Sequence, residues 1–512
     1  MNTRQTITAW MAMAAASVAA TGAHGAVAIS SGTTKDMVCS AGVCSPTSAD
    51  AVLNTGDLET LLATGNVEVT TTGSGVQADN ILVSKAFHWV NSARLTLQAH
   101  RSITIDKRIL VEGLAGVVLR TNAGGKGGVL SFGPQGHLAL KNLSSSLAIN
   151  GTAYTLAGSV STLASDIAAN PGGYYALAVS YNASADGTYN EPPVSTSLSG
   201  IVEGLGNTIS NLTIFTEPGG ANTNTGLFAD VAFLAAVKDL RLDMLSVERS
   251  GGYGIGPVGG LAGTNEGLLS GDETAGVGAA YDCAYCPLGG LVGSNSGTIE
   301  NSSANVQLKG ARFVGGLVAS NAGTINLSHA TGAVRGQGNG SAGGLVSYNE
   351  GLISESYATG FVRDPSGVSL GGLVGEDLAG GVSDSYATGA VEGGKRSVVG
   401  GLAGYASRVS ITYSYSTGSG VVGEYGEFGG FVGKDHKRAR TINAAFTDDC
   451  WDTTTSGTDQ GTGNDGNVSG ITGLTTAQLQ SGLPAGFNPS IWAEKSGING
   501  GLPYLIANPP AK

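Results

Sequence analysis

Five aspartates near the C-terminal end form the densest group of side chains that could hold a metal ion. They are Asp448, Asp449, Asp452, Asp459 and Asp465. Carboxylate oxygens are the ligands that Ca²⁺ prefers in proteins. A solvated acidic loop explains the same cluster without any ion. We therefore expect no cofactor other than a possible Ca²⁺, for which Asp448, Asp449 and Asp452 are the candidate ligands.

Five cysteines could form disulfides, hold zinc or carry redox chemistry. Cys39 and Cys44 lie close in sequence, Cys283 and Cys286 form a CxxC pair, and Cys450 is left over. A zinc site would need a second CxxC or nearby histidines, and a thioredoxin-like site would need a βαβ unit, and the sequence indicates neither. In an exported chain, both close pairs are predicted to be local structural disulfides.

Two glycine-containing motifs known from enzymes also occur. Gly367–Gly371 matches the GxSxG pattern, with Ser369 at its centre, and Gly461–Gly466 matches GxGxxG. The first needs a strand–turn–helix setting and the second needs a βαβ unit, and neither setting is evident around them. Matches of this kind arise by chance in a chain with 84 Gly in 512 residues. The sequence therefore predicts no catalytic or cofactor-binding residues and no enzyme.

The high glycine content bounds the fold class that must position these residues. Only 14 residues are Pro, and Gly does not recur at every third place, so collagen is excluded. Long helices would carry a large entropic cost at this glycine content. Only 12% of residues are charged and Val, Ile and Leu recur throughout, which argues against simple disorder. An all-β chain with many turns remains.

A repeat of about 28 residues organises the second half of the chain. A Gly-Gly pair followed by an apolar strand recurs every 26–30 residues, at Gly259, Gly289, Gly315, Gly343, Gly371, Gly400 and Gly429. A propeller blade needs roughly 40–50 residues, and no copy contains a helix-length periodic stretch. A coil of three short strands and three turns is typical of a parallel β-helix, and the crossover rule favours its right-handed form.

Equivalent residues of successive coils are predicted to lie above one another as ladders. The apolar ladder comprises Ile299, Ile325, Ile353, Val382 and Ile411. An aromatic ladder comprises His329, Tyr357, Tyr386 and Tyr415, with Phe446 as its extension. The asparagines Asn265, Asn295, Asn321 and Asn349 are predicted to take a left-handed turn conformation and to stack as an amide ladder.

Shorter coils precede these repeats. Ile81, Val83, Phe87, Trp89, Leu95 and Leu97 recur 22 residues later as Ile103, Ile105, Ile109, Val111, Val117 and Leu119. Short helices are expected near Asp57, Ser161 and Thr475. One continuous solenoid from about residue 55 to 450 is therefore expected. The predicted organisation is a leader at 1–25, an N-terminal segment and cap at 26–64, short coils at 65–143, a transition coil at 144–200, long coils at 201–446 and a C-terminal cap at 447–512.

The N-terminus has the pattern of a secretory signal peptide. Arg4 provides the basic region, residues 7–20 are apolar, and small residues follow, with cleavage after residue 25 or as late as 28. No other apolar run is long enough to span a bilayer. The net charge of −12 makes nucleic acid a poor partner. We therefore expect an exported protein that is not anchored by a transmembrane segment.

The repeat pattern GGLVGxNxGxIxxSYATGxV resembles the GLUG-motif repeats of bacterial surface exoproteins. The segment that begins at Ile201, IVEGLGNTISNLTIF, and the endings WDTTTSG, GLTTAQLQ and NGGLPYL are similar to parts of filamentous haemagglutinin-like proteins. The resemblance implies a β-helical adhesin at the cell surface, associated with the outer membrane and exported with a possible secretion partner there. The NPNL and NPNGI signatures of that family's secretion domain are absent from this sequence. Such motifs also occur in some large exported peptidases, whose catalytic domain lies outside the repeats.

Two functions are therefore open at this point. The first is a non-enzymatic, adhesin-like protein whose extended face binds a host or cell-surface glycan or protein. The basic residues Lys434, Lys437, Arg438 and Arg440 could contact an acidic glycan. The alternative is a carbohydrate-active lyase or hydrolase, which would need two or three carboxylates, or Arg and Lys, converging from adjacent coils.

Overall fold

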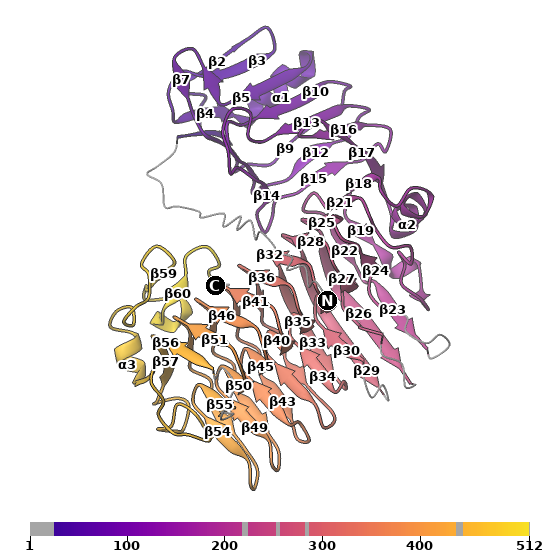
Figure 1. Ribbon diagram of the computed structural model, residues 1–512. Coiled ribbons are helices and arrows are strands. Elements are labelled where there is room, and N and C mark those ends of the chain that lie inside the picture. The colour runs from indigo at the N-terminus through magenta and orange to yellow at the C-terminus, as the bar shows by residue number, and fades with distance from the viewer. Residues whose placement is uncertain (1–24, 218–223, 252–255, 282–285, 437–443, 511–512) are drawn as a thin grey trace, which may run out of the picture.

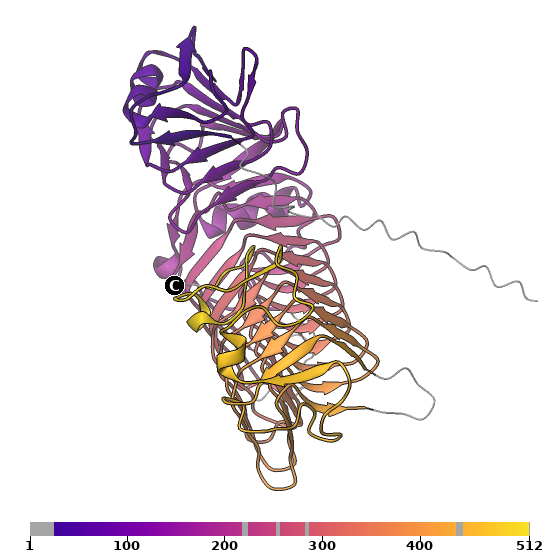
Figure 2. The same ribbon diagram turned by 90° about the vertical axis from the view of Figure 1, so that its left-hand side faces the viewer.

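The chain folds as an all-β solenoid of about 13 turns, with 47% of its residues in strands and 6% in helices. The computed structural model describes residues 25–217, 224–251, 256–281, 286–436 and 444–510. Figures 1 and 2 show a shorter N-terminal part, in indigo and purple, followed by a longer part in magenta to orange. The predicted parallel β-helix is confirmed. The predicted leader, apart from its last residue, lies outside the described residues.

The N-terminal segment contributes strands to the first coil. Strand β1 (Ala26–Ser30) pairs in parallel with β4 (Ala51–Asn54) and with β8 (Asn80–Val83). The predicted helix near Asp57 is α1 (Thr55–Thr64), where the Asn54 side chain caps the N-terminus and Leu58 and Leu62 enter the core. This segment is therefore part of the solenoid, with a helix packed on it.

The predicted 22-residue repeat is confirmed rung by rung. Ile81 pairs with Ile103, Phe87 with Ile109, and Leu95 with Val117. The strands of these short coils are β5 (Val67–Thr70), β9 (Phe87–Trp89), β10 (Arg94–Gln98), β11 (Ile103–Ile105), β12 (Ile109–Val111), β13 (Gly116–Arg120), β14 (Leu130–Phe132) and β15 (Leu138–Leu140). Their inward residues are Ile, Val, Leu and aromatic side chains that are almost fully buried, except in β14, where Leu130 and Phe132 are half-buried.

The solenoid is interrupted between its two parts, which differs from the expected continuous coil. Strand β16 (Ser146–Ile149) pairs antiparallel with β17 (Thr152–Ala157), so the chain reverses direction there. The sheet then continues in parallel through β18 (Tyr174–Leu177) and β21 (Ile201–Glu203). The interior of the coils is divided near this reversal into two apolar clusters. The hairpin sequence Ile149-Asn-Gly-Thr152 carries the Asn-Gly turn signal for this reversal.

Arg241 fastens the two parts across this joint. Its guanidinium donates hydrogen bonds to the backbone oxygens of Gly136 and Gly206 at 3.3 and 3.0 Å, and of Phe132 and Gly133 at 3.3 and 2.8 Å. Helix α2 (Val160–Ala169), which the sequence predicted, packs Val160, Leu163 and Ile167 into the core of the long part.

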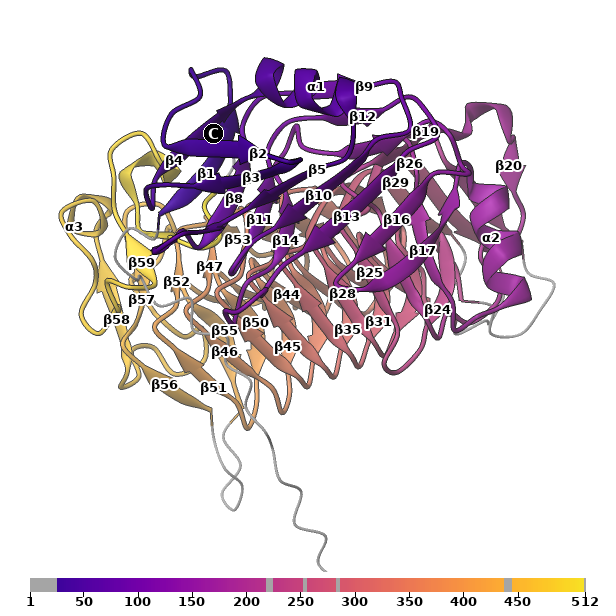
Figure 3. The same ribbon diagram turned by 90° about the horizontal axis from the view of Figure 1, so that it is seen from above.

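The four coils between residues 313 and 421 contain five short strands each, where three were predicted. The coil that begins at residue 313 has β34 (Phe313–Gly315), β35 (Val318–Asn321), β36 (Thr324–Asn326), β37 (His329–Ala330) and β38 (Val334–Arg335). The next coil repeats them as β39 (Ser341–Gly343), β40 (Val346–Asn349), β41 (Leu352–Ser354), β42 (Tyr357–Ala358) and β43 (Val362–Asp364). Figure 3 shows these coils stacked side by side. The additional strands are two or three residues long, which is too short for an alternating pattern in the sequence.

The predicted apolar ladder is confirmed. Ile299, Ile325, Ile353, Val382 and Ile411 pair in register and are buried. Phe446 pairs with Ile411 and extends this ladder, so its assignment to the aromatic ladder is wrong; Cys450 lies beneath Tyr415 instead. The extra residues between these coils shifted the alignment made from sequence.

The Gly-Gly corners are explained by close approach of neighbouring backbones. A Cβ on Gly344 would lie 2.0 Å from the carbonyl oxygen of Gly372 in the next coil, and a Cβ on Gly372 would lie 2.1 Å from that of Gly401. These distances are far below contact, so any side chain would force the coils apart. The stacking of coils therefore requires glycine at this position.

A ladder of serines runs through the long coils beside the apolar ladder. Each hydroxyl accepts the backbone N–H of the preceding rung; Ser356 Oγ accepts Ser328 N at 3.1 Å and donates to Ser354 O at 2.7 Å. The rungs are Ser302, Ser328, Ser356, Ser385 and Ser414, all fully buried. Asp272 precedes the first rung and Asp449 follows the last.

We expect Ser356→Ala to lower the free energy of unfolding by about 1–3 kcal/mol, because the buried Ser328 N–H would lose its acceptor. Ser383→Ala is the matched control, since Ser383 occupies the same position as Ser354 one coil on and is partly exposed, and its loss should change stability by no more than about 0.5 kcal/mol. Urea denaturation of both variants measures the difference. Equal stabilities of the two variants would show that the ladder hydrogen bonds contribute nothing.

Candidate functional site

The candidate calcium ligands have structural roles. Asp449 accepts hydrogen bonds from the backbone of Ser414 and Thr447, as the last rung of the serine ladder. Asp452 accepts the Thr476 hydroxyl at 2.6 Å and also caps the following turn. Asp448 has a φ of 51°, the left-handed turn position that each coil places before its serine. Among the described residues, no group of three or more His, Cys, Asp or Glu is arranged to hold a metal ion.

The cysteines follow the prediction where they are described. Cys39 and Cys44 form a disulfide that closes the hairpin of β2 (Met37–Ser40) and β3 (Val43–Pro46). Cys286 is also disulfide-bonded, and Cys283, its predicted partner, lies outside the described residues. Cys450 is a free, buried thiol, and burial raises its pKa, so it stays protonated at neutral pH. Ser369 of the GxSxG match is buried within β44 (Ser369–Gly371).

Carboxylates from adjacent coils do converge, at the joint between the two parts. Burial raises the pKa of Glu203 and Asp272 well above the usual range, and the nearby charge of Asp239 adds to both shifts. Burial also raises the pKa of Asp239 itself to about 7. Glu203 is 3% exposed and Asp272 is fully buried. Both are therefore closed to a substrate in this structure, whatever their protonation state.

The predicted asparagine ladder is confirmed, but its backbone conformation is not. Each Asn Nδ2 donates to the Oδ1 of the next rung, at 2.7–2.8 Å from Asn265 through Asn349. Their φ angles are not positive, because these residues end strands such as β35 and β40. Asn349 donates at 3.0 Å to Asp377, which stands at the next rung.

The aromatic ladder is real but faces outward. Successive rings from His329 to Tyr415 stack with centroids 4.6, 4.8 and 5.1 Å apart and with interplanar angles of 9° or less. The alanines that follow Tyr357 and Tyr386 point into the core instead. The three tyrosines are nevertheless fully buried, because the C-terminal segment lies over them. The predicted C-terminal cap thus covers the side of the solenoid as well as its end.

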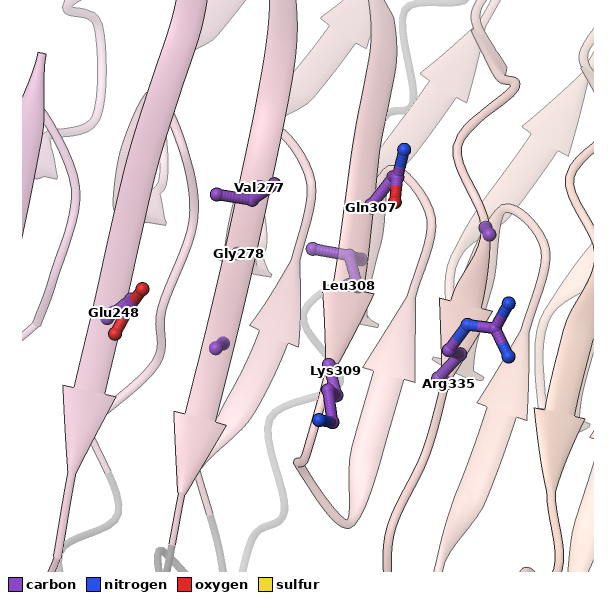
Figure 4. Close-up of a pocket in the computed structure, with 9 residues that line it drawn as sticks. Glu248, Val277, Gly278, Gln307, Leu308, Lys309 and Arg335 are labelled. Atoms are coloured by element: carbon purple, nitrogen blue, oxygen red, sulfur yellow. The ribbon is translucent and has the colours of Figure 1, made fainter. Parts of the chain in front are cut away.

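A shallow groove of about 560 Å³ crosses the outer face of four neighbouring strands. The strands are β26 (Arg241–Ser250), β29 (Glu273–Tyr281), β33 (Ser303–Lys309) and β38. Figure 4 shows the groove, with Gly278 in its floor and Glu248, Gln307, Lys309 and Arg335 at its sides. The small side chains of Ala279 and Ala333 leave the groove open.

A row of cations continues from this groove along the solenoid axis. Lys309, Arg335 and Arg363 pair in register on successive coils and are exposed. Neighbouring strands lie about 4.8 Å apart, so these charges recur at that spacing. Arg335 also lies over the Phe361 ring, and Arg363 pairs with Glu392 at 3.5 Å. We call Lys309, Arg335 and Arg363 the cation row.

Sequence reasoning missed the cation row, because its members occupy one position in three imperfect repeats: Gln-Leu-Lys309, Ala-Val-Arg335 and Phe-Val-Arg363. The signal was present as a basic residue after a buried aliphatic one in each copy. The basic cluster that sequence reasoning favoured is described only at Lys434, which pairs with Glu427 at 2.9 Å. The other three members lie outside the described residues.

Comparisons with known proteins find likenesses among solved structures. No protein-family model and no curated protein matches the sequence. A solved structure named IgA1 protease matches 57% of this chain at 18% identity, with a TM-score of 0.35. The match covers 21% of that protease chain, so this chain corresponds to only a small share of its length. Within the described residues, no helix has the length and hydrophobicity that a membrane span requires.

Proposed function

We propose that this protein is an exported, adhesin-like surface protein that binds an elongated acidic glycan along the groove and the cation row. The observation that carries the proposal is the cation row itself, which is built from three successive coils beside the groove. The coils pair in register, so the charges recur at a regular spacing along the solenoid axis. A linear polyanion presents its charges in the same way, at regular intervals along one direction.

Charge supports an acidic ligand over a neutral one. The chain has 38 acidic and 26 basic residues, so three cations in consecutive coils are unusual on its surface. A protein with a net charge of −12 repels polyanions in general, and local attraction at the row would confine binding to that face. The signal peptide pattern and the resemblance to GLUG-motif exoproteins support export to the cell surface.

We expect Arg335→Glu to weaken binding of sulfated or uronate-containing polysaccharides by at least about 10-fold, because it reverses the central charge of the row. Surface charge interactions are screened by salt, so binding should also weaken above about 0.3 M NaCl. Binding of purified residues 26–512 to immobilised polysaccharides measures both effects. Lys85→Glu, the same charge change at an exposed position of the short coils, is the matched control and should bind like wild type.

Two outcomes would contradict the proposal. Equal losses in both variants would show that only net charge matters, and failure to bind any polysaccharide would leave the groove without this role. The carbohydrate-active alternative is tested in the same experiment by measuring the release of reducing sugar from every polysaccharide that binds. Release that copurifies with the protein and is unchanged in Arg335→Glu would favour an enzyme with its site elsewhere.

A further inference from the structure

The C-terminal segment runs back along the outside of the solenoid over the aromatic ladder. We call residues 475–508 the strap. It contains only short elements of its own: α3 (Thr476–Leu479), β59 (Trp492–Ala493), the 3-10 helix η2 (Asn499–Gly501) and β60 (Tyr504–Leu505). In Figure 2 the strap is the yellow segment that lies across the orange coils. Helices and hairpins of this length are not stable alone in water, so the strap depends on what it covers.

The centre of the strap is held by aromatic packing. Trp492 is 1% exposed, and its ring centroid lies 6.0 Å from that of Tyr386 and 5.8 Å from that of Tyr415. Its indole N–H donates to Asp384 Oδ1 at 3.0 Å. Phe487 packs against Trp492, with ring centroids 4.8 Å apart, and its ring lies 6.5 Å from that of Tyr415. This contact therefore joins two successive coils through one side chain.

Hydrogen bonds also tie the strap to several coils. At its start the Thr476 hydroxyl donates to Asp452 Oδ2 at 2.6 Å. Further along, the Tyr415 hydroxyl donates to Pro503 O at 2.7 Å and accepts Asn499 Nδ2 at 2.8 Å. Near the end of the strap, Asn508 Nδ2 donates to Ser328 O and Glu355 O at 3.2 and 3.0 Å. Leu479 and Leu505 belong to the same buried cluster as the tyrosines and Cys450. The ties therefore extend over five coils, those of His329, Tyr357, Tyr386, Tyr415 and Cys450.

This arrangement departs from the behaviour of an ordinary solenoid. In such folds each repeat contacts only its neighbours, so coils open from an end one after another. We infer that the strap fastens the coils from His329 to Cys450 into one cooperative unit, which opens only after the strap has left. The strap thus protects the C-terminal end of an extended surface protein, the end from which fraying would otherwise begin. This inference is independent of the ligand proposed for the groove.

Native-state hydrogen exchange on residues 26–512 tests the inference, because it reports opening in coils far from the mutated residue. Asn508→Ala removes ties to the first two coils of the unit only, and its side chain touches none of the other three. We expect amides of β52 (Tyr415–Ser416) and β57 (Asp449–Asp452) to exchange about 5–30-fold faster in this variant, by the same factor as amides of β42. Tyr415→Phe, which removes ties to the fourth coil of the unit, should accelerate exchange at β37 likewise.

The control is Leu291→Ala, in a long coil that the strap does not reach. Its effect should be largest in its own coil and fall off over the adjacent ones, as expected for nearest-neighbour coupling. An increase in Asn508→Ala that is confined to β37 and β42 would overturn the inference and leave the strap as a local cover. Equal exchange rates in Asn508→Ala and wild type throughout the five coils would overturn it too. The Asn508 hydrogen bonds would then contribute nothing to the stability of the other coils.

Discussion

Replacing Tyr386 with alanine should lower the free energy of unfolding by about 3–5 kcal/mol, the usual cost of truncating a buried aromatic ring. Tyr386 is fully buried, stacks on a tyrosine at each face and contacts Trp492 at its edge. Truncation would open a cavity between two coils and the strap together. Urea or thermal denaturation, followed by Trp fluorescence, measures the loss.

Two phenylalanine variants separate packing from hydrogen bonding in this prediction. Among the described residues the Tyr386 hydroxyl has no hydrogen-bond partner, so Tyr386→Phe should be neutral or stabilising by up to about 1 kcal/mol. Tyr415→Phe removes the donor to Pro503 O and should cost about 1–2 kcal/mol. If Tyr386→Phe were as costly as Tyr415→Phe, a bound water or another partner must satisfy the Tyr386 hydroxyl, and the packing account of the ladder would need revision.

The ladders could be predicted from sequence because stacking makes residue identity repeat. Ile325 pairs with Ile353 and Tyr357 with Tyr386 since the same position in each coil meets the same neighbours. The prediction fails where the number of residues per coil changes. Phe446 follows a coil enlarged by several residues, so pattern alignment placed it with the tyrosines although it continues the isoleucines.

The strap and the joint could not be predicted for a different reason. Trp492 has no counterpart in any repeat, and its partners Tyr386 and Asp384 lie more than 100 residues away, so no periodicity marks the contact. In the sequence Arg241 is only one polar residue in a predicted strand. Its hydrogen bonds to the backbone of the short coils depend on a chain reversal at residue 150, which the repeats do not indicate. The aspartates near residue 449 showed the opposite error, because a cluster in sequence became separate turn and ladder positions in space.

Buried carboxyls give the second large expected effect, on stability as a function of pH. Burial raises the pKa of Asp364, Asp377 and Asp449 to about 6, about 7 and about 8, against 3.8 for an unperturbed aspartate. At pH values between the pKa of an aspartate in the unfolded chain and its raised pKa in the folded protein, the folded state holds a proton that the unfolded state has released. The free energy of unfolding therefore falls as pH rises. Stability should therefore be greatest near pH 4 and decrease steadily towards pH 8, with thermal midpoints following the same trend.

Asp377→Asn should remove much of this dependence on pH. Asp377 ends the asparagine ladder, accepts from Asn349, and has a second buried oxygen with no partner among the described residues. Its pKa interval from 3.8 to about 7 corresponds to about 4 kcal/mol between pH 4 and pH 8, at about 1.4 kcal/mol per unit. The amide carries no charge, so the variant should resemble wild type at pH 4 and exceed its stability at pH 8.

Urea denaturation at both pH values measures the change, with Asp57→Asn, an exposed aspartate of α1, as control. Parallel pH profiles for wild type and Asp377→Asn would mean that Asp377 ionises without cost, which would require solvent to reach this rung of the ladder.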